Sequence, residues 1–350
     1  MTSTRVMPAE WAPQSAVMLT WPHPGTDWFR RLEAVEPVFL AIARAVLRFE
    51  HLLISCEQVF RAEQLERELN DWARAHALPG RAHCVPAPSN DTWARDHGPI
   101  AVQTDDGIRL LDFRFNAWGG KFPWEKDNAL NQHLATAGCF GDTPLQPVDF
   151  VLEGGSIESD GQGTVLVTSE CLMTPTRNPD YDRAQIEMLL AETLGAERVL
   201  WLNHGYLAGD DTDSHIDTLA RFCQPDHICH VRCSNPDDEH YPALAAMEEE
   251  LRQFRQADGS PYRLTALPWP DPVMNEDGER LPATYANFLI INAAVLVPTY
   301  DVPQDEQALA VFRDIFPDRE IIAIPCRPLV EQHGSLHCVT MQLPADVVTL

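Results

Sequence analysis

The chain has 350 residues, of which 26 are lysine or arginine and 52 are aspartate or glutamate, so its formal net charge is −26. Its 45% share of apolar residues is that of a globular protein and not of a disordered chain. Nucleic acids and anionic membranes attract basic surfaces, so this acidic balance argues against both as the main partner. It is compatible with a small cationic substrate, and it leaves a homo-oligomer open.

Nothing in the sequence predicts export or membrane insertion. Residues Met1–Glu10 contain no apolar run of the kind that a signal peptide needs. The longest apolar stretch, Phe288–Val297, is well short of the roughly 20 residues of a membrane span. The nine cysteines are scattered and odd in number, which is not typical of a disulfide framework. We therefore expect a cytoplasmic protein with reduced thiols.

Helical and strand patterns alternate along the chain. Helices are predicted at Phe29–Phe49, Glu57–Ala77, Glu125–Ala137, Tyr181–Leu194, Asp238–Gln256 and Gln304–Ile315. Strands are predicted at Ala16–Trp21, His51–Cys56, Ala82–Pro86, Pro99–Gln103, Ile108–Phe113, Gly163–Val167, Arg198–Leu202, Thr218–Phe222, Ile228–Cys233, Arg263–Leu267, Phe288–Ile291, Ala294–Val297, Glu320–Ile324 and Val339–Leu343.

The order strand, strand, helix, strand recurs about five times, at roughly 70 residues each, without visible sequence identity between the units. This order predicts an α/β protein. A closed ring of five units satisfies it, and so does an open doubly wound sheet. No low-complexity linker divides the chain, so residues 1–350 are predicted to form a single domain.

Acidic residues and histidines gather beside glycine and tryptophan in four segments. Each segment lies at a loop-to-strand junction, where functional residues collect on rigid folds. The four are Asn90–Pro99, Leu152–Ser156, Gly209–Thr218 and His333–Val339. Their similar positions in successive units indicate one shared centre.

Cys338 is the candidate nucleophile. A free cysteine is more often a small buried hydrophobe, and it becomes a nucleophile only where a base or cation lowers its pKa. Adjacent strand side chains point to opposite faces, so His337 is poorly placed to act on Cys338. His215 is the leading candidate for the base. In an extended strand it shares a face with Asp217, and carboxylates favour the protonated imidazole.

Asp96, Trp93 and Glu153 can be interpreted in two ways. A carboxylate pair binds a planar guanidinium through forked hydrogen bonds, and a tryptophan can pack against a cation. Alternatively, Asp96 forms an ordinary salt bridge with Arg95, and Trp93 belongs to the core. Glu153 precedes two glycines, which permit close backbone approach, but it could equally be a solvated turn residue.

Metal and cofactor motifs are weak. A group of cysteines and histidines lacks the two-residue spacing of structural zinc sites, and a hairpin explains it as well; its members are Cys223, His227, Cys229, His230 and Cys233. His215 and Asp217 could hold a catalytic metal, although no third ligand is apparent. No dinucleotide motif, phosphate loop or nucleophile-elbow motif occurs.

Taken together, four motifs resemble those of the agmatine deiminase and bacterial peptidylarginine deiminase family of the guanidine-modifying pentein superfamily. They are Trp93-Ala-Arg95-Asp96-His-Gly98-Pro99, Glu153-Gly-Gly-Ser156, His215-Ile-Asp217 and His337-Cys338. The resemblance extends from Trp21 to Gln342. It implies a five-bladed α/β propeller of ββαβ units with pseudo-fivefold symmetry. It also implies a hydrolase of putrescine and polyamine biosynthesis that converts agmatine to N-carbamoylputrescine and ammonia.

The resemblance also implies roles for single residues. Cys338 matches the nucleophile that forms a covalent amidino-cysteine intermediate, and His215 matches the general acid and base. Asp96 and Asp217 match the carboxylates that clamp the guanidinium. Three further positions match pocket residues: Glu153 contacts the substrate or orients the histidine, Trp93 forms a wall, and Asn287 lies in the pocket. Asp211 aligns with an acidic position that suits a distal amine. No metal or organic cofactor is implied.

The chain departs from the family pattern near the expected pocket. His97 stands where many agmatine deiminases have threonine, residues 210–214 differ from the commoner Asp-Glu-Thr-Asn-Gly, and Cys338 does not follow a run of glycines. Peptidylarginine and other small guanidines therefore stay open as substrates, and a peptide carboxylate would need a cation such as Arg114 or Arg177. A metal-dependent hydrolase and an inactive binding scaffold are further alternatives, although retention of Cys338 and His215 argues against the scaffold.

Overall fold

The computed structural model describes residues 5–350. Its α-helices are α1 Leu32–Leu47, α2 Val59–Ala75, α3 Ala94–His97, α4 Ala117–Gly120, α5 Glu125–Asn128, α6 Leu130–Thr136, α7 Ser169–Leu172, α8 Arg183–Leu194, α9 Tyr241–Gln253 and α10 Asp305–Ile315. Four 3₁₀ turns are η1 Asp27–Arg30, η2 Gly154–Ser156, η3 Ile216–Thr218 and η4 Leu329–Gln332.

In this described part, the strands form five separate sheets. Four sheets follow each other along the chain: β5 Ile100–Thr104, β6 Gly107–Arg114 and β7 Leu145–Val151; β8 Ile157–Ser159, β9 Thr164–Thr168 and β10 Arg198–Leu202; β11 Ala220–Gln224, β12 His227–Val231 and β13 Arg263–Leu267; β14 Leu289–Ile291, β15 Ala294–Thr299 and β16 Glu320–Pro325. The fifth sheet joins the two ends of the chain, through β17 Thr340–Pro344, β2 Gln14–Thr20, β3 His51–Cys56 and β4 Ala82–Pro86.

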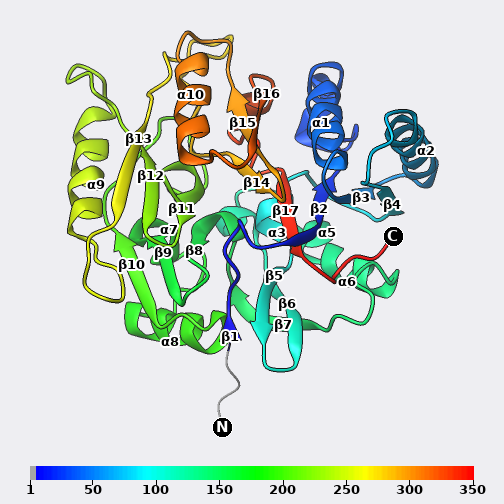
Figure 1. Cartoon of the computed structure of the whole chain (residues 1–350), viewed down its shortest axis with the longest axis horizontal. Helices are drawn as coiled ribbons and strands as arrows, with labels where there is room; N and C mark the ends of the chain where they lie inside the picture. The colour runs from blue at the N-terminus through cyan, green and yellow to red at the C-terminus, as the bar shows by residue number, and fades with distance from the viewer. Residues whose placement is uncertain (1–4) are drawn as a thin grey trace.

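All five sheets repeat one pattern. The first strand pairs antiparallel with the second, and a helical connection then leads to a third strand that is parallel to the second. A parallel pair requires such a crossover, because its two strands run in the same direction. The short strand β1 Arg5–Val6 adds an edge to β5. In Figure 1 the long helices lie on the outside of the molecule and the strands lie nearer its centre.

Local sequence explains these elements. Helix α2 buries Ala62, Leu65, Leu69 and Ala73, which recur at helical spacing, so one face of the helix packs on the protein. Helix α8 begins at a capping box made by Asp182 and Gln185 and ends at Gly195, whose φ of 72° is accessible to glycine at little cost. The strand residues Leu289–Ile291 and Ala294–Val297 are fully buried, which explains their apolar runs, and exposed Asn292 and Ala293 form the turn between them.

The six predicted helices are all present, with ends that shift by a few residues, and Glu125–Ala137 divides into α5 and α6. Four strands have the predicted ends: β3, β4, β10 and β13. The predicted strand Thr218–Phe222 is wrong at its start, because η3 occupies Ile216–Thr218. Three strands were not predicted: β1, β7 and β8. β7 contains Pro147 and exposed polar residues, and β8 is only three residues long.

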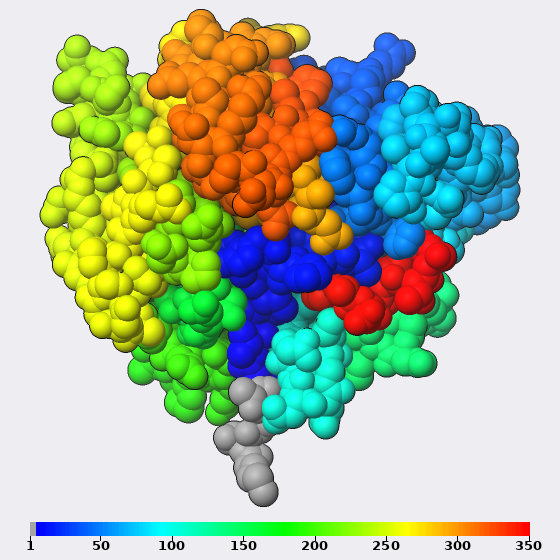
Figure 2. Space-filling view, in the orientation of Figure 1, coloured from blue at the N-terminus to red at the C-terminus, as the bar shows by residue number. Residues whose placement is uncertain are grey.

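Residues 7–13, here called the N-terminal segment, run between β1 and β2. In Figure 2 the blue N-terminal part of the chain lies across the middle of the visible face. Three contacts fix the segment: the Met7 N–H donates to the Leu194 carbonyl at 2.9 Å, the Met7 carbonyl accepts from Ser159 Oγ at 2.8 Å, and the Pro13 carbonyl accepts from the Ala345 N–H at 2.9 Å. Across residues 5–350, no helix combines the length and apolar character that a membrane crossing requires.

Candidate active site

Five short turns carry the predicted site residues, and each lies just before the first strand of a different sheet. Asp96 lies in α3 before β5, Glu153 precedes η2 and β8, and His215 and Asp217 lie at η3 before β11. Asn287 precedes β14, and Cys338 precedes β17. The turns occupy equivalent positions in the repeated pattern, and this explains why residues far apart in the sequence meet. Asp96 and Cys338, more than 240 positions apart, line the same pocket.

Gly155 marks the centre of this cluster. A β-carbon placed on Gly155 would lie 2.6 Å from His215 Nδ1, 2.8 Å from Asp96 Oδ1 and 3.1 Å from Asp217 Oδ2. These distances are far below ordinary van der Waals contact, so the three side chains can converge only on a residue without a side chain. This is the close backbone approach that the two glycines after Glu153 predicted.

The carboxylate of Asp96 is held from two sides. Its Oδ1 accepts from the Gly155 N–H and its Oδ2 accepts from Trp118 Nε1, both at 3.0 Å. Burial, together with the charges of Asp217 and Glu153, raises the pKa of Asp96 to about 6. The alternative that Asp96 pairs with Arg95 is wrong, because Arg95 Nη1 lies 3.3 Å from Glu10 and its guanidinium points away from this cluster.

Asp217 is buried, but its pKa is lowered. Burial alone would raise the pKa, and the hydrogen bond and charge of His337 outweigh that effect. The Asp217 Oδ2 lies 2.7 Å from His337 Nδ1 and 3.3 Å from Asn287 Nδ2. Its Oδ1 is buried and has no hydrogen-bond partner among the described residues. Asp217 therefore presents one free carboxylate oxygen to the site.

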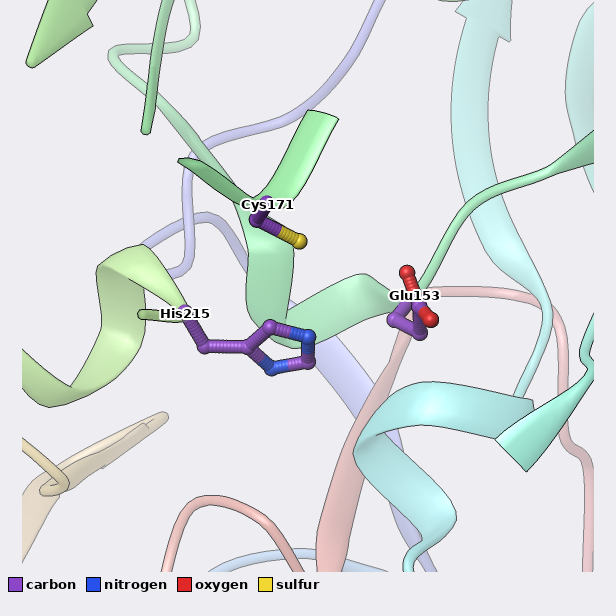
Figure 3. A group of neighbouring side chains, drawn as sticks. All are labelled: Glu153, Cys171 and His215. Atoms are coloured by element: carbon purple, nitrogen blue, oxygen red, sulfur yellow. The ribbon is translucent and has the colours of Figure 1, made fainter. Parts of the chain in front are cut away.

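His215 lies at the start of η3, so the extended backbone assumed in the argument that His215 and Asp217 share a face is wrong. Its Nδ1 is 3.6 Å from Asp96 Oδ1, and neither ring nitrogen has a hydrogen-bond partner within residues 5–350. Figure 3 shows the imidazole, the Cys171 thiol and the Glu153 carboxylate facing a common space. Burial would lower the pKa of His215, but the neighbouring Asp96, Cys171 and Glu153 raise it well above its ordinary value. The imidazole is therefore held protonated.

Cys338 lies two residues before β17, in a turn. Its Sγ is 3.4 Å from Asn287 Oδ1 and 4.0 Å from Asp217 Oδ2. Burial and the charges of Asp217 and Asp96 raise the pKa of the Cys338 thiol well above its ordinary value. His337 does not approach the thiol and contacts Asp217 instead. The expectation that it would not serve Cys338 agrees with this geometry, although the turn, and not strand alternation, separates the two side chains.

Cys338, Asp96 and Trp93 line a pocket of about 390 Å³ that opens between aromatic and acidic side chains. Trp118 and Phe122 form its aromatic wall with Trp93, and the lining carboxylates are Asp27, Asp91, Asp96 and Asp211. Trp93 Nε1 donates to Asp91 Oδ2 at 3.0 Å, and Gly334 leaves room for the indole ring. Trp93 thus lines the pocket and also packs against buried Trp28, at a ring distance of 5.8 Å.

The basic residues near the pocket are already paired. Arg177 Nε donates to Glu153 Oε1 at 3.0 Å, and the same guanidinium binds Asp213 and the Thr212 carbonyl. Lys121 Nζ lies 3.0 Å from Asp213 Oδ1. Arg114 pairs with exposed Asp149. The two arginines considered as partners for a peptide carboxylate are therefore engaged elsewhere.

Two departures from the family pattern have structural explanations. His97 does not line the pocket; it is buried beside Phe115, with Nε2 3.3 Å from Thr20 Oγ1, and burial lowers its pKa to about 3. Asp210 caps its own loop, where its carboxylate accepts from the Thr212 N–H at 3.2 Å and the Ser214 N–H at 2.7 Å.

The donor atoms of Glu153, Cys171 and His215 lie within 4.8 Å of one another, which is a geometry that could admit a cation (Figure 3). Arg177 places a positive charge 3.0 Å from Glu153, and this charge opposes a divalent ion. Among residues 5–350, the cysteines and histidines at 223–233 form no group of three donor atoms that could hold a zinc ion. The pair His215 and Asp217 has no third ligand in the same described part of the chain.

Sequence reasoning missed Trp118, Cys171 and Glu10 in this region. Trp118 has a φ of 56° and precedes two glycines, in the same way as Glu153 does, so that pattern was a usable signal. Cys171, in α7, carried no such signal in the sequence. Glu10 lies far from every motif in the sequence.

Known proteins resemble this chain along almost its whole length. The sequence profile of the Porphyromonas-type peptidyl-arginine deiminase family matches residues 6–344. An agmatine deiminase from Stutzerimonas stutzeri is 34% identical over 98% of this chain and 96% of its own. A substrate-bound agmatine deiminase of C. jejuni superposes with a TM-score of 0.89 at 36% identity, covering 97% of this chain and 96% of that one. A Porphyromonas gingivalis protein, described provisionally as an arginine deiminase, superposes with a TM-score of 0.92 at 51% identity, covering 99% of this chain and 100% of that one.

The mixed α/β fold and these full-length similarities define a member of the guanidine-modifying pentein superfamily. More narrowly, the chain belongs to the Porphyromonas-type peptidyl-arginine deiminase family. Its similar proteins include several agmatine deiminases.

Proposed function

We propose that this protein is an agmatine deiminase, which hydrolyses agmatine to N-carbamoylputrescine and ammonia. One observation carries the proposal: two buried carboxylate oxygens near Gly155 lack a hydrogen-bond partner among the described residues. They are Asp217 Oδ1 and Glu153 Oε2. Buried polar groups without partners are costly and usually await a ligand. A planar guanidinium supplies several N–H donors and a positive charge to such a site.

In this proposal, Asp96 and Asp217 hold the guanidinium beside the Cys338 thiol. The bound cation offsets the two negative charges that raise the pKa of Cys338, so substrate binding favours the thiolate. Asn287 holds the turn of Cys338, because its Oδ1 accepts from the His337 N–H at 2.8 Å and lies 3.3 Å from the Cys338 nitrogen. Glu153 and Asp96 keep His215 protonated and ready to donate.

The chemistry then has two halves. The thiolate attacks the guanidinium carbon, a C–S bond forms and a C–N bond breaks, and His215 gives its proton to the departing ammonia. In the second half, His215 takes a proton from water, the oxygen attacks the same carbon, and the C–S bond breaks to restore the thiolate. The proton left on the product oxygen is taken up by the released ammonia, which leaves as ammonium. A covalent step divides one difficult hydrolysis into two easier ones.

The far end of the pocket supports agmatine over arginine. Asp27, Asp91 and Asp211 line it and suit a terminal ammonium, whereas Arg177 and Lys121 are occupied by acidic groups. An α-carboxylate there would be repelled and unpaired, at a cost of several kcal/mol. We therefore expect agmatine to exceed free arginine by at least about 10³ in kcat/KM, since about 1.4 kcal/mol is tenfold.

Three further features are proposals of the same kind. We infer that the five sheets close into a pseudo-fivefold α/β propeller with the site at its axis, supported by the equivalent turns that carry the site and by the β17–β2 pairing. We also infer that the chain is one domain and works in the cytoplasm. An assembly of several copies stays compatible with all of this.

Mass spectrometry of the products tests the function. Purified protein is incubated with agmatine, arginine and a peptide ending in arginine, and we expect N-carbamoylputrescine from agmatine alone. Turnover of arginine or of the peptide at a similar rate would contradict the assignment and favour peptidylarginine deimination. Retention of full activity after dialysis against a chelator is expected, and its loss would favour the metal-dependent alternative.

Replacement of the nucleophile gives the matched control. Cys338→Ala should lose turnover while its unfolding temperature stays near that of the wild type. Cys139→Ala, which alters a buried cysteine outside the pocket, should keep its turnover. Loss of turnover in both variants would show that the effect is structural.

A further inference from the structure

The N-terminal segment places a carboxylate behind the candidate site. Glu10 Oε1 lies 2.6 Å from His337 Nε2, and the other ring nitrogen of His337 lies 2.7 Å from Asp217 Oδ2. The imidazole therefore bridges Glu10 and the carboxylate that has a free oxygen for the guanidinium. His337 and Asp217 are buried, with side chains 1% and 0% exposed, and Glu10 is partly buried, at 16%.

Two arginines fix Glu10 in this position. Arg221 Nη2 lies 2.5 Å from Glu10 Oε2, and Arg95 Nη1 lies 3.3 Å from Glu10 Oε1. Gln342 Nε2 also donates to Glu10 Oε2 at 2.9 Å. Arg221 is itself completely buried and holds the carbonyls of Ala286 and Phe288, on either side of Asn287. The network thus ties the N-terminal segment to two of the turns that carry the site.

Substrate does not reach Glu10. Glu10 lines a separate cavity of about 610 Å³, which shares no residue with the pocket of Cys338. Arg95 and Gly154 line this second cavity, while their neighbours Asp96 and Gly155 face the site. Two stretches of backbone therefore separate the two cavities, and Glu10 can affect the reaction only through another residue.

We propose that Glu10 is a positioning residue, which acts through His337 to hold Asp217 in the orientation that binds the guanidinium. A histidine that contacts only Asp217 could rotate about its side-chain bonds. Glu10 fixes the ring from its second nitrogen, together with Arg221, whose Nη2 lies 3.0 Å from the same Nε2. The same use of an outer carboxylate is common where histidines hold metal ions. The proposal rests on the proposed deiminase function.

Glu158 provides a matched control. It is a second buried carboxylate on Arg221, bound at Nε, and it also accepts from the Phe222 N–H at 3.2 Å. Its carboxylate lies within 4.8 Å of a ring nitrogen of His337 but makes no hydrogen bond or ion pair with His337 or Asp217 among the described contacts. Glu10→Gln and Glu158→Gln thus remove the same charge from the same arginine, and only the first removes a direct partner of the histidine.

We expect Glu10→Gln to lower kcat/KM for agmatine about 10- to 100-fold, the range typical for an outer partner. Glu158→Gln should stay within about threefold of the wild type, although both variants lose stability. In a His337→Gln background, Glu10→Gln should cause no further loss, because its effect is transmitted through the ring. If Glu10→Gln does not fold, Glu10→Asp withdraws the carboxylate but keeps its charge, and the same losses are expected.

Equal losses in the two Gln variants, an unchanged Glu10→Gln enzyme, or additive losses in the double variant would overturn the proposal. A readout without turnover separates it from the proposed function. The ring-nitrogen resonances of His337, assigned by their loss in His337→Gln, should shift in Glu10→Gln and clearly less in Glu158→Gln. An absence of agmatine turnover in the wild type would refute the function, whereas unshifted resonances would refute the positioning role.

Discussion

Gly155 shows how a single missing side chain shapes the site. Its replacement by alanine would place a methyl group 2.6 Å from His215 Nδ1 and 2.8 Å from Asp96 Oδ1. We expect Gly155→Ala to lower kcat/KM at least about 100-fold, because small displacements of reacting groups are that costly. Steady-state kinetics with agmatine and thermal unfolding measure the two effects separately.

Gly25→Ala is the control for this variant. Gly25 is exposed, and its new methyl group would meet only the imidazole of His23 at 3.0 Å, which can move. Its activity and stability should stay near those of the wild type. A Gly155→Ala enzyme with normal kinetics would show that the three side chains do not converge as described.

The raised pKa of Asp96 predicts an acid limit for the reaction. The clamp needs the ionised carboxylate, so kcat/KM should fall below the pKa of about 6, by about tenfold for each further pH unit. A profile of kcat/KM from pH 4.5 to 8 measures the midpoint of this fall. A midpoint near pH 4 would contradict the role of Asp96 as the group that sets the acid limit. Because the folded protein holds this proton more tightly than the unfolded chain, the same group lowers the free energy of unfolding as pH rises from about 4 to 6.

The individual site residues differ in how visible they were in the sequence. Cys338, His215, Asp96, Asp217 and Glu153 occur in short motifs whose residue types suit guanidine chemistry, and the structure brings them together. The contacts that tune them were not visible, because Trp118, Cys171 and Glu10 come from turns that only the folded chain brings near. The argument that His215 and Asp217 share a face assumed an extended backbone, since their acidic neighbours gave no sign of a 3₁₀ turn.

Among the elements, helix α8 offers a clean test of local stability. The Asp182 side chain accepts from the Gln185 N–H at 2.9 Å, and Gln185 Oε1 accepts in return from the Asp182 N–H at 2.8 Å. Asp182→Ala should lower the free energy of unfolding by about 1 kcal/mol, because an N-cap is lost. Denaturant titration measures the difference.

Activity should be unaffected, because no residue of α8 lines either the pocket of Cys338 or the cavity beside Glu10. Asp180→Ala, which changes an exposed aspartate just outside the helix, is the matched control and should be neutral. Equal losses in both variants would mean that the capping box contributes nothing beyond the loss of a surface charge.

The elements themselves were predictable where one physical signal dominated. Helical spacing of apolar residues located every long helix, and buried β-branched runs located most strands. The exceptions follow from physics as well. β1, of two residues, and β8, of three, are too short to show a pattern, and the proline in β7 hides a strand at the edge of its sheet. Neither spacing nor turns could decide between a ring and an open sheet.

At the scale of the whole molecule, the net charge of −26 should speed the capture of a dication. Long-range attraction is screened by salt, because the Debye length shrinks from about 30 Å at 0.01 M to about 8 Å at 0.15 M. We expect kcat/KM for agmatine to fall over this range while kcat changes little. Kinetics at several salt concentrations check this, with sucrose at matched viscosity as the control, and a kcat/KM that does not depend on salt would contradict it.

The strand that completes the sheet of β2, β3 and β4 comes from the last part of the chain to be made. β2 is synthesised early but finds its antiparallel partner only when β17 follows, and Cys338 arrives immediately before that strand. A growing chain on the ribosome therefore carries His215 and its carboxylates long before it has a nucleophile. The thiol joins the site only as the two ends of the chain pair, so the site lacks its nucleophile until β17 has docked on β2.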